Sequence, residues 1–194
     1  MFPVRPRKSN STQRTNTMKI CLLMGSPHLE GTTAALAEAF SEGARAAGHE
    51  VERIDVETLT IEPCTNALLE RLTKGEDVDT DGMAKVFASL LKADAVVLAT
   101  PLYYYGMTAQ LKAVVDRFVS RNDEVAAKGL KAVLLAVAAG PAPEAMEPLS
   151  AQFRAICGYL KWTNAGQVFG LGLAMRPLEE TDALDEARKL GASL

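Results

Sequence analysis

The sequence predicts an α/β protein, a doubly wound three-layer sandwich built on five parallel strands. Two observations predict it. From Met18 onward, short apolar runs alternate with longer amphipathic stretches, and strands that are separated by helical crossovers must run parallel. A length of 194 residues suits one such domain. In a sheet of this kind the ligand lies beyond the carboxyl ends of the strands, where the strand order reverses.

Five short runs predict the strands. The first, at residues 19–24, is continuously apolar after its lysine, as expected of a strand that is buried on both faces. The other runs predict strands at residues 51–56, 95–99, 132–138 and 167–174. We expect the chemistry at three carboxyl ends, after Met24, Ala99 and Ala138.

Five stretches with apolar residues at helical spacing predict the helices. In the clearest of them, Met83, Val86, Phe87 and Leu90 recur at i, i+3, i+4 and i+7. The helices are expected at residues 32–47, 83–91, 107–118, 146–160 and 179–191. Residues 57–82 are polar and irregular. A loop of that length in a compact domain indicates a functional segment or the remnant of one.

Residues 1–17 differ in composition from the rest of the chain, because they carry four basic residues and no acidic one. They show no hydrophobic periodicity, so we expect a disordered basic extension and place the folded domain at residues 18–194. A transit peptide is the alternative interpretation. Without these four charges the net charge of −3 becomes −7 for residues 18–194, which predicts no binding of nucleic acid or anionic lipid.

The cysteines and the apolar runs indicate where the protein works. Cys21, Cys64 and Cys157 are few and far apart, which excludes a disulfide scaffold and favours a reducing compartment. The longest apolar runs, such as residues 133–139, are too short to span a membrane. We therefore expect a cytoplasmic protein.

The segment from Gly25 to Thr33 joins the first strand to the first helix. It is neither a Walker A loop nor a dinucleotide fingerprint. The free N–H groups at a helix N-terminus, together with the hydroxyls of Ser26, Thr32 and Thr33, suit a phosphate monoester bound without a metal. The alternative is that the two threonines only cap the helix. His28 either adds charge to the phosphate or points to solvent.

Three of the four tyrosines, Tyr103, Tyr104 and Tyr105, follow the third strand. Consecutive tyrosines at a carboxyl strand end suit stacking against a flat ring. Packing on a partner subunit is the alternative, and both can hold. Thr108 is placed to cap the next helix.

The two loops together resemble those of the NAD(P)H-dependent FMN reductases, a family of flavodoxin-like proteins. The matching motifs are Gly25-Ser26-Pro27 with Gly31-Thr32-Thr33, Thr100-Pro101-Leu102-Tyr103, and Leu111-Lys112-Ala113-Val114-Val115-Asp116-Arg117. The resemblance implies a flavodoxin-like sheet of order 2-1-3-4-5, bound FMN, and NAD(P)H as co-substrate. It also implies that flavin N5 is the reactive centre, with no catalytic side chain and no metal.

The same resemblance assigns twelve residues to the cofactor site, around the phosphate, along the ribityl chain and ring, and beside the ring where small residues let the backbone approach. They are Ser26, His28, Thr32 and Thr33; Pro101, Leu102, Tyr103, Tyr104, Tyr105 and Gly106; and Ala139 and Gly140. The family often has Arg in place of His28, so the charge contact with the phosphate is weaker here. Lys112, Asp116 and Arg117 are expected to orient their helix through ion pairs.

One branch of the family, the iron–sulfur flavoproteins, carries a compact cysteine motif before the second helix. Residues 61–64 resemble its opening and residues 79–83 its closing segment, but the intervening cysteines are absent. A single thiolate cannot hold a cluster, so we expect none. Cys64 is interpreted as a remnant of the motif, the alternative being a reactive thiol near the flavin.

These observations predict an FMN-dependent NAD(P)H oxidoreductase whose acceptors are quinones, nitro or azo aromatics, or free flavin. A flavodoxin-type electron carrier without substrate turnover is the alternative from another class, and a flavin-binding subunit of a larger enzyme is a third. By resemblance we expect a homodimer or homotetramer, with a small-molecule acceptor as the only other partner.

Overall fold

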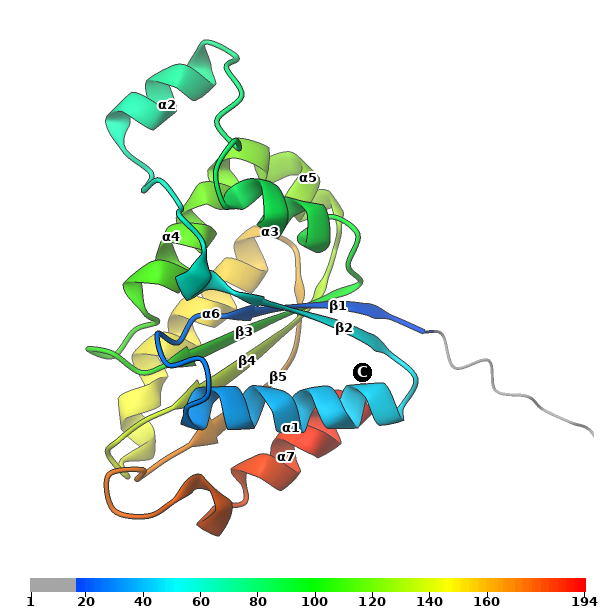
Figure 1. The fold of residues 1–194 in the computed structure, drawn as a ribbon, viewed down its shortest axis with the longest axis vertical. Helices are drawn as coiled ribbons and strands as arrows, with labels where there is room; N and C mark the ends of the chain where they lie inside the picture. The colour runs from blue at the N-terminus through cyan, green and yellow to red at the C-terminus, as the bar shows by residue number, and fades with distance from the viewer. Residues whose placement is uncertain (1–16) are drawn as a thin grey trace, which may run out of the picture.

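Five parallel strands form one sheet in the order β2-β1-β3-β4-β5, which confirms the predicted fold class and strand order (Figure 1). The computed structural model describes residues 17–194, so the extension expected at residues 1–17 lies outside the described residues except for Thr17. The strands are β1 (Lys19–Met24), β2 (Glu50–Asp55), β3 (Ala95–Pro101), β4 (Lys131–Val137) and β5 (Thr163–Gly170).

The parallel register brings the carboxyl ends of the central strands to one edge of the sheet. Met24 at the end of β1 pairs with Ala99 of β3, and Pro101 at the end of β3 pairs with Val137 of β4. Every residue of β1 except Lys19 is buried, because helices cover both faces of a parallel sheet. The loops that follow β1, β3 and β4 therefore start side by side.

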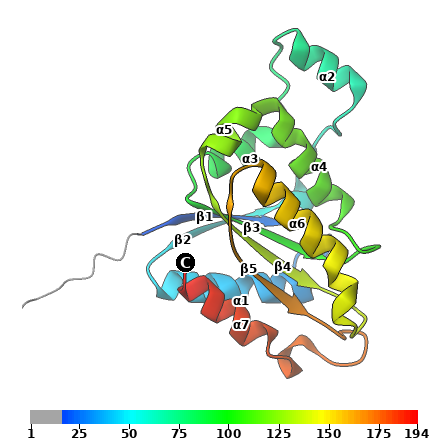
Figure 2. The ribbon, with the colours of Figure 1, turned by 180° about the vertical axis from the view of Figure 1, so that it is seen from behind.

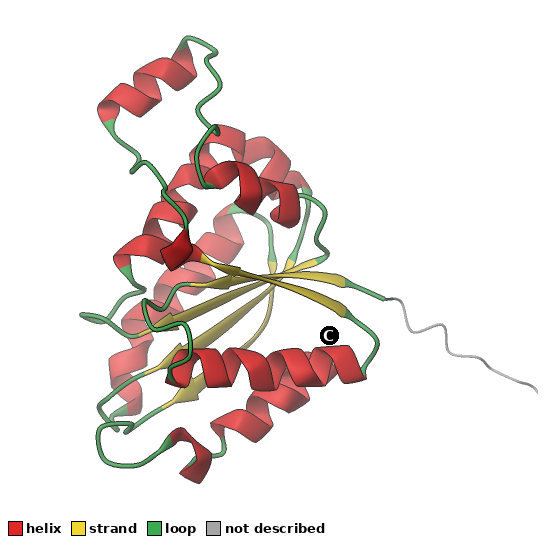
Figure 3. Cartoon of the chain, viewed as in Figure 1, coloured by secondary structure: helices red, strands yellow, loops and turns green. Residues whose placement is uncertain are grey.

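Helices cover the two faces of the sheet, and each layer packs on its own hydrophobic cluster (Figures 2 and 3). One face is covered by α1 (Thr32–Ala46) and α7 (Ala183–Ala192). The other is covered by α3 (Met83–Leu90), α4 (Ala109–Arg117), α5 (Asn122–Ala127) and α6 (Glu147–Tyr159). Short 3₁₀ turns complete the chain at Val56–Thr58, Phe118–Arg121, Pro143–Met146 and Leu178–Glu180. Among the helices of residues 17–194, none has the length and apolarity that a membrane span requires.

Three predicted elements are wrong in detail. The segment 57–82 is not irregular throughout, because it contains the helix α2 (Asn66–Thr73), which Thr65 caps by accepting a hydrogen bond from the Leu68 amide. The fifth strand runs from Thr163 to Gly170 rather than from residue 167 to residue 174. The short helix α5 was not anticipated, and the last helix begins at Ala183, after a 3₁₀ turn, rather than at residue 179.

A fully buried arginine holds the ends of the segment that carries α2, which projects away from the sheet (Figure 1). Arg117 Nη1 donates to the Glu62 carbonyl at 2.9 Å and to the Asp81 carboxylate at 2.8 Å. Its Nη2 donates to the Val78 carbonyl at 2.6 Å and to the Asp79 carboxylate at 3.2 Å. A buried cation needs such partners, since an unpaired one is strongly destabilising.

The motif residues on α4 therefore act through ion pairs, as expected. Arg117 joins α4 to the segment 57–82, while Lys112 pairs with Asp116 one helical turn away on the helix surface. The exposed pair contributes little to stability, whereas the buried one fixes where the segment returns to the sheet.

We predict that Asp81→Asn lowers the free energy of unfolding by about 1–3 kcal/mol at pH 7 and by progressively less as the pH falls below 3.8. Burial acts to raise the pKa of the Asp81 carboxyl, but hydrogen bonds from the Glu62 and Met83 amides and from Arg117 outweigh it and hold the pKa below its ordinary value of 3.8. The ionised form is thus favoured in the folded state. The stabilisation by the ionised carboxylate is present above pH 3.8. It is lost as the pH falls through the lower pKa of Asp81 in the folded state.

Urea denaturation of the wild-type protein and of Asp81→Asn, from pH 7 downward, measures the difference in their free energies of unfolding. Asp185→Asn serves as the control, because Asp185 forms a surface pair with Arg188 and its side chain is 74% exposed. A destabilisation by Asp81→Asn that is the same at every pH would contradict the account.

Candidate functional site

A cavity of about 330 Å³ opens at the carboxyl edge of the sheet. Its walls come from the loop after β1, the start of α1, the segment after β3, the end of β4 and the loop after β5. The lining residues are Ser26, His28, Gly31, Thr32, Thr33, Pro101, Leu102, Tyr103, Val137, Ala138, Ala139, Leu173 and Ala174. Its volume is at the lower end of the range for small-molecule clefts.

The structure brings eight of the twelve predicted site residues to this cavity. They are Ser26, His28, Thr32, Thr33, Pro101, Leu102, Tyr103 and Ala139. Tyr104, Tyr105, Gly106 and Gly140 lie outside its walls, although each is next in sequence to a lining residue or to another of the four. Contact of the twelve residues with a cofactor stays a prediction.

Sequence reasoning missed the part of the wall that follows β5. Leu173 and Ala174 line the cavity because their amides donate to the carbonyls of Ala138 and Ala139, both at 3.1 Å, and so hold the loop against the end of β4. The sequence interpretation placed both residues inside the fifth strand. Gly172, whose φ is +76°, was the available signal that the strand ends before them.

The N-terminus of α1 points its free backbone groups at the cavity. The N-cap residue is Gly31, and no side chain caps the helix. The alternative that Thr32 and Thr33 merely cap the helix is therefore wrong. The first N–H groups of a helix have no intrahelical partner, and they carry partial positive charge. Together with Thr33, whose buried side chain lines the cavity, they form a site for an anion.

Hydrogen bonds on both sides fix the loop that precedes α1. Inside it, the Ser26 hydroxyl, which is buried, accepts from the His28 amide at 3.1 Å. Outside it, Arg53 of β2 donates to the Leu29 carbonyl at 2.8 Å while it pairs with Asp55. The loop is thus held in shape without a ligand.

His28 is the one lining residue whose side chain can carry a positive charge. It is exposed at the rim. An anion in this cavity would therefore depend on backbone N–H groups and hydroxyls more than on a fixed cation. Within residues 17–194, no three His, Cys, Asp or Glu side chains come together to hold a metal ion.

The tyrosine segment forms a two-residue turn with strained backbone. Tyr103 and Gly106 exchange two hydrogen bonds of 3.0 Å, and between them Tyr104 and Tyr105 have φ of +45° and +64°. Such a turn favours Asn-Gly, because a left-handed conformation costs an L-residue about 1–2 kcal/mol. Tyr104 is fully exposed and Tyr105 is 61% exposed, so their own packing does not offset the strain. Strain of this kind is typical of functional positions.

The cysteines do not assemble into a cluster site. Cys64 lies just before α2 and is partly buried, whereas Cys21 lies in β1 and Cys157 in α6. Burial raises the pKa of the Cys21 thiol to about 12 and that of Cys157 to about 11, so both stay protonated. Thiols in that state are poor metal ligands.

We predict that the double variant Tyr104→Asn/Tyr105→Gly raises the free energy of unfolding by about 1 kcal/mol, because Asn and Gly adopt the left-handed conformation with less strain. Thermal and urea denaturation measure the change. Leu69→Asn, at a residue that is 37% exposed on α2 with ordinary helical backbone, provides the control and is expected to give no gain. Loss of stability in the double variant would show that the tyrosines make contacts that outweigh the strain.

Comparisons with known proteins agree with the fold. A family model described as NADPH-dependent FMN reductase matches residues 18–175. An iron–sulfur flavoprotein of Archaeoglobus fulgidus is 29% identical over 184 residues, which cover 91% of this chain and 79% of that protein. An FMN-dependent NADH:quinone oxidoreductase of Burkholderia pseudomallei is 30% identical over 117 residues, which cover 54% of this chain and 58% of that protein.

Solved structures share the fold at low sequence identity. An azoreductase from Bacillus anthracis aligns with a TM-score of 0.68 at 21% identity, over 92% of this chain and 100% of its own. An NAD(P)H:quinone oxidoreductase from Methanothermobacter marburgensis aligns with a TM-score of 0.65 at 23% identity, over 91% of this chain and 96% of its own.

Proposed function

The chain belongs to the NADPH-dependent FMN reductase family, and from that premise we propose that it passes a hydride from a nicotinamide, through FMN held in the cavity at the sheet edge, to a quinone, a nitro or azo aromatic, or free flavin. The protein is an FMN-dependent oxidoreductase. One observation carries the assignment of the site: the uncapped N-terminus of α1 and the wall formed by β3 and β4 meet in a single cavity.

The residues of the cavity fit the two ends of FMN. At one end, the free N–H groups of α1 with the Ser26 and Thr33 hydroxyls suit a phosphate monoester. At the other end, Ala138 and Ala139 leave the backbone accessible to a flat ring. Next in sequence, Gly140 lies outside the walls, and a side chain placed on it would meet no atom within 4 Å, so the space beside it is open.

When bound, FMN supplies the two-electron chemistry, and the protein supplies binding and orientation. The walls contain no carboxylate, and their ionisable side chains are His28 and Tyr103, both exposed. We infer that the lining residues bind and orient the reactants and do not transfer protons. The open rim suits a range of acceptors whose common feature is a flat, electron-poor ring. Azoreductase and quinone oxidoreductase are the activities in the names of similar proteins.

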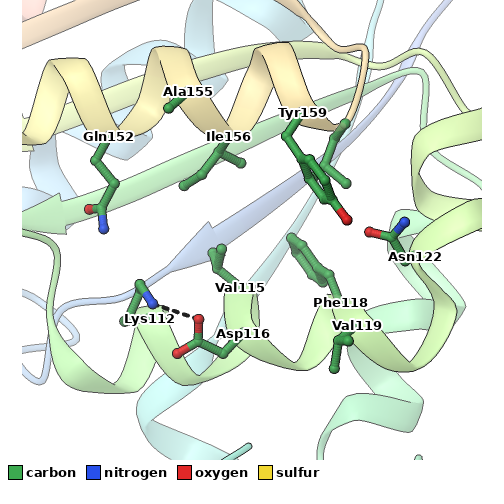
Figure 4. Close-up of a pocket in the computed structure, with 11 residues that line it drawn as sticks. Lys112, Val115, Asp116, Phe118, Val119, Asn122, Gln152, Ala155, Ile156 and Tyr159 are labelled. Atoms are coloured by element: carbon green, nitrogen blue, oxygen red, sulfur yellow. Dashed lines mark hydrogen bonds and ion pairs between the residues drawn. The ribbon is translucent and has the colours of Figure 1, made fainter.

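We further propose that the protein is a homo-oligomer that pairs through a groove of about 400 Å³ between α4 and α6 (Figure 4). The one cation that lines the groove, Lys112, is paired with Asp116, and the floor is apolar, with Val115, Phe118 and Ile156. On its rim, Lys112 and Asp116 lie one helical turn apart. If two α4 helices pack antiparallel about a two-fold axis, Lys112 lies near Asp116 of the partner subunit, so the face is complementary to itself.

The three cysteines are all free thiols in the structure, which suits a reducing compartment. We propose the cytoplasm as the location.

We predict that the purified protein binds FMN and that NADPH or NADH then bleaches the visible absorbance of the bound flavin under anaerobic conditions. Restoration of the absorbance by a quinone or an azo dye would identify the acceptor class. A protein that neither retains FMN nor oxidises NAD(P)H with FMN in excess would contradict the proposed function.

We predict that His28→Arg lowers the Kd for FMN about 3–10-fold at low ionic strength, because it places a fixed positive charge at the rim beside the phosphate end. The Kd for riboflavin, which lacks the phosphate, is expected to stay unchanged. Fluorescence quenching measures both. A gain for riboflavin equal to that for FMN would show that the phosphate does not lie near His28.

We predict that Tyr159→Glu, which adds a charge to the α4–α6 groove, dissociates the oligomer. Size-exclusion chromatography with light scattering measures the mass. Leu69→Glu is the control, since Leu69 is 37% exposed on α2, remote from the groove. If Tyr159→Glu leaves the mass of the oligomer unchanged, the subunits pair through another surface.

A further inference from the structure

Two buried threonines connect the two loops that form the cofactor cavity. Thr100 and Thr108 are completely buried, and neither lines the cavity. The Thr108 hydroxyl donates to the carbonyl of Gly25 at 2.6 Å, across 83 residues of sequence. The Thr108 amide donates to the Thr100 hydroxyl at 3.1 Å.

The Thr108 hydroxyl uses both its proton and a lone pair. As the N-cap of α4 it accepts from the Leu111 amide at 3.3 Å, and its proton goes to Gly25. Capping alone needs only an acceptor. Thr65 shows this at α2, where its hydroxyl accepts from the Leu68 amide. The donated bond is therefore an addition to the cap.

The bond to Gly25 fixes the start of the phosphate loop. The Gly25 amide donates to the Ala99 carbonyl of β3 at 2.7 Å, so the residue is tied on both sides. It must be glycine here, because a Cβ would lie 2.6 Å from the Leu111 side chain on α4. Loss of the Thr108 donor would leave the Gly25 carbonyl unpaired in the interior.

The bond to Thr100 closes the tyrosine loop at its base. Residues 101–107 lie between Thr100 and Thr108, and the strained turn from Tyr103 to Gly106 lies inside this loop. The phosphate loop and the tyrosine loop are thus attached to the same residue, the first through the Thr108 hydroxyl and the second through the Thr108 amide. Neither can move relative to the other without breaking a buried hydrogen bond.

We propose that Thr108 is a positioning residue whose hydroxyl sets the separation between the phosphate end and the ring end of the cavity. The proposal rests on the proposed function, in which FMN occupies that cavity. FMN joins a phosphate and a ring by one chain, so its affinity gains from simultaneous contact at both ends. Riboflavin and inorganic phosphate each use one end and do not depend on the separation.

The test compares three ligands on Thr108→Val, which keeps the shape of the side chain and removes its hydroxyl, and on Thr108→Ser, which keeps the hydroxyl. We expect Thr108→Val to raise the Kd for FMN about tenfold. The Kd values for riboflavin and inorganic phosphate should change by less than about twofold. Thr108→Ser should restore FMN binding. Isothermal titration calorimetry at a temperature where all variants are folded measures each Kd.

Thr65→Val is the matched control, since it removes the hydroxyl that caps α2 away from the cavity. It should lower the melting temperature and leave the Kd for FMN unchanged. If Thr108→Val does not fold, Thr100→Val takes its place, because it removes the bond at the base of the tyrosine loop and retains the cap and the bond to Gly25. The same selective loss of FMN affinity is expected.

An unchanged Kd for FMN in the valine variants overturns the inference. So does an equal loss for riboflavin and FMN, which would show general destabilisation of the ring end, or a Thr108→Ser variant that behaves as Thr108→Val. Failure of the wild-type chain to bind FMN is a separate result, and it overturns the proposed function together with this inference.

Discussion

The parallel pairing of β1, β3 and β4 is the constraint on which the site depends. Parallel strands place all their carboxyl ends at one edge, and the register sets Met24 beside Ala99 and Pro101 beside Val137. Three loops that are far apart in sequence therefore start next to one another. The N-terminus of α1 faces the same edge because a helix that follows a parallel strand begins where that strand ends.

Two buried polar contacts hold the segments whose positions the pairing of the strands does not determine. Arg117 joins α4 to the segment that carries α2, and Thr108 joins α4 to the phosphate loop. Both lie on α4, at opposite ends. This helix thus positions the cofactor loops at its N-terminus and the projecting segment at its C-terminus. In the segment, Cys64 is the only cysteine, and a single thiolate cannot hold an iron–sulfur cluster.

The strands could be predicted because continuous apolar runs follow directly from burial, whereas the strand order and most of the cavity wall were implied by the resemblance to a known family. The errors have physical causes. The helix α2 has only eight residues and buries only Leu68, so its apolar face is too short to distinguish it from a loop. The edge strand β5 begins with the polar Thr163 and Asn164, which concealed its start, and the apolar residues after Gly170 extended its predicted end to residue 174. The left-handed Tyr104 and Tyr105 carry no turn signal, and the partners of Arg117 lie 36–55 residues away.

The central claim is that the cavity at the carboxyl edge, and not the larger groove between α4 and α6, holds FMN with its phosphate at the start of α1. Amide chemical shifts of ¹⁵N-labelled protein, recorded with and without FMN, test it most directly. The account predicts that the largest changes occur at Ser26, Thr32 and Thr33 and around Ala139, and that riboflavin leaves the first three nearly unchanged. Changes centred on Val115 and Ile156 in the groove would contradict it.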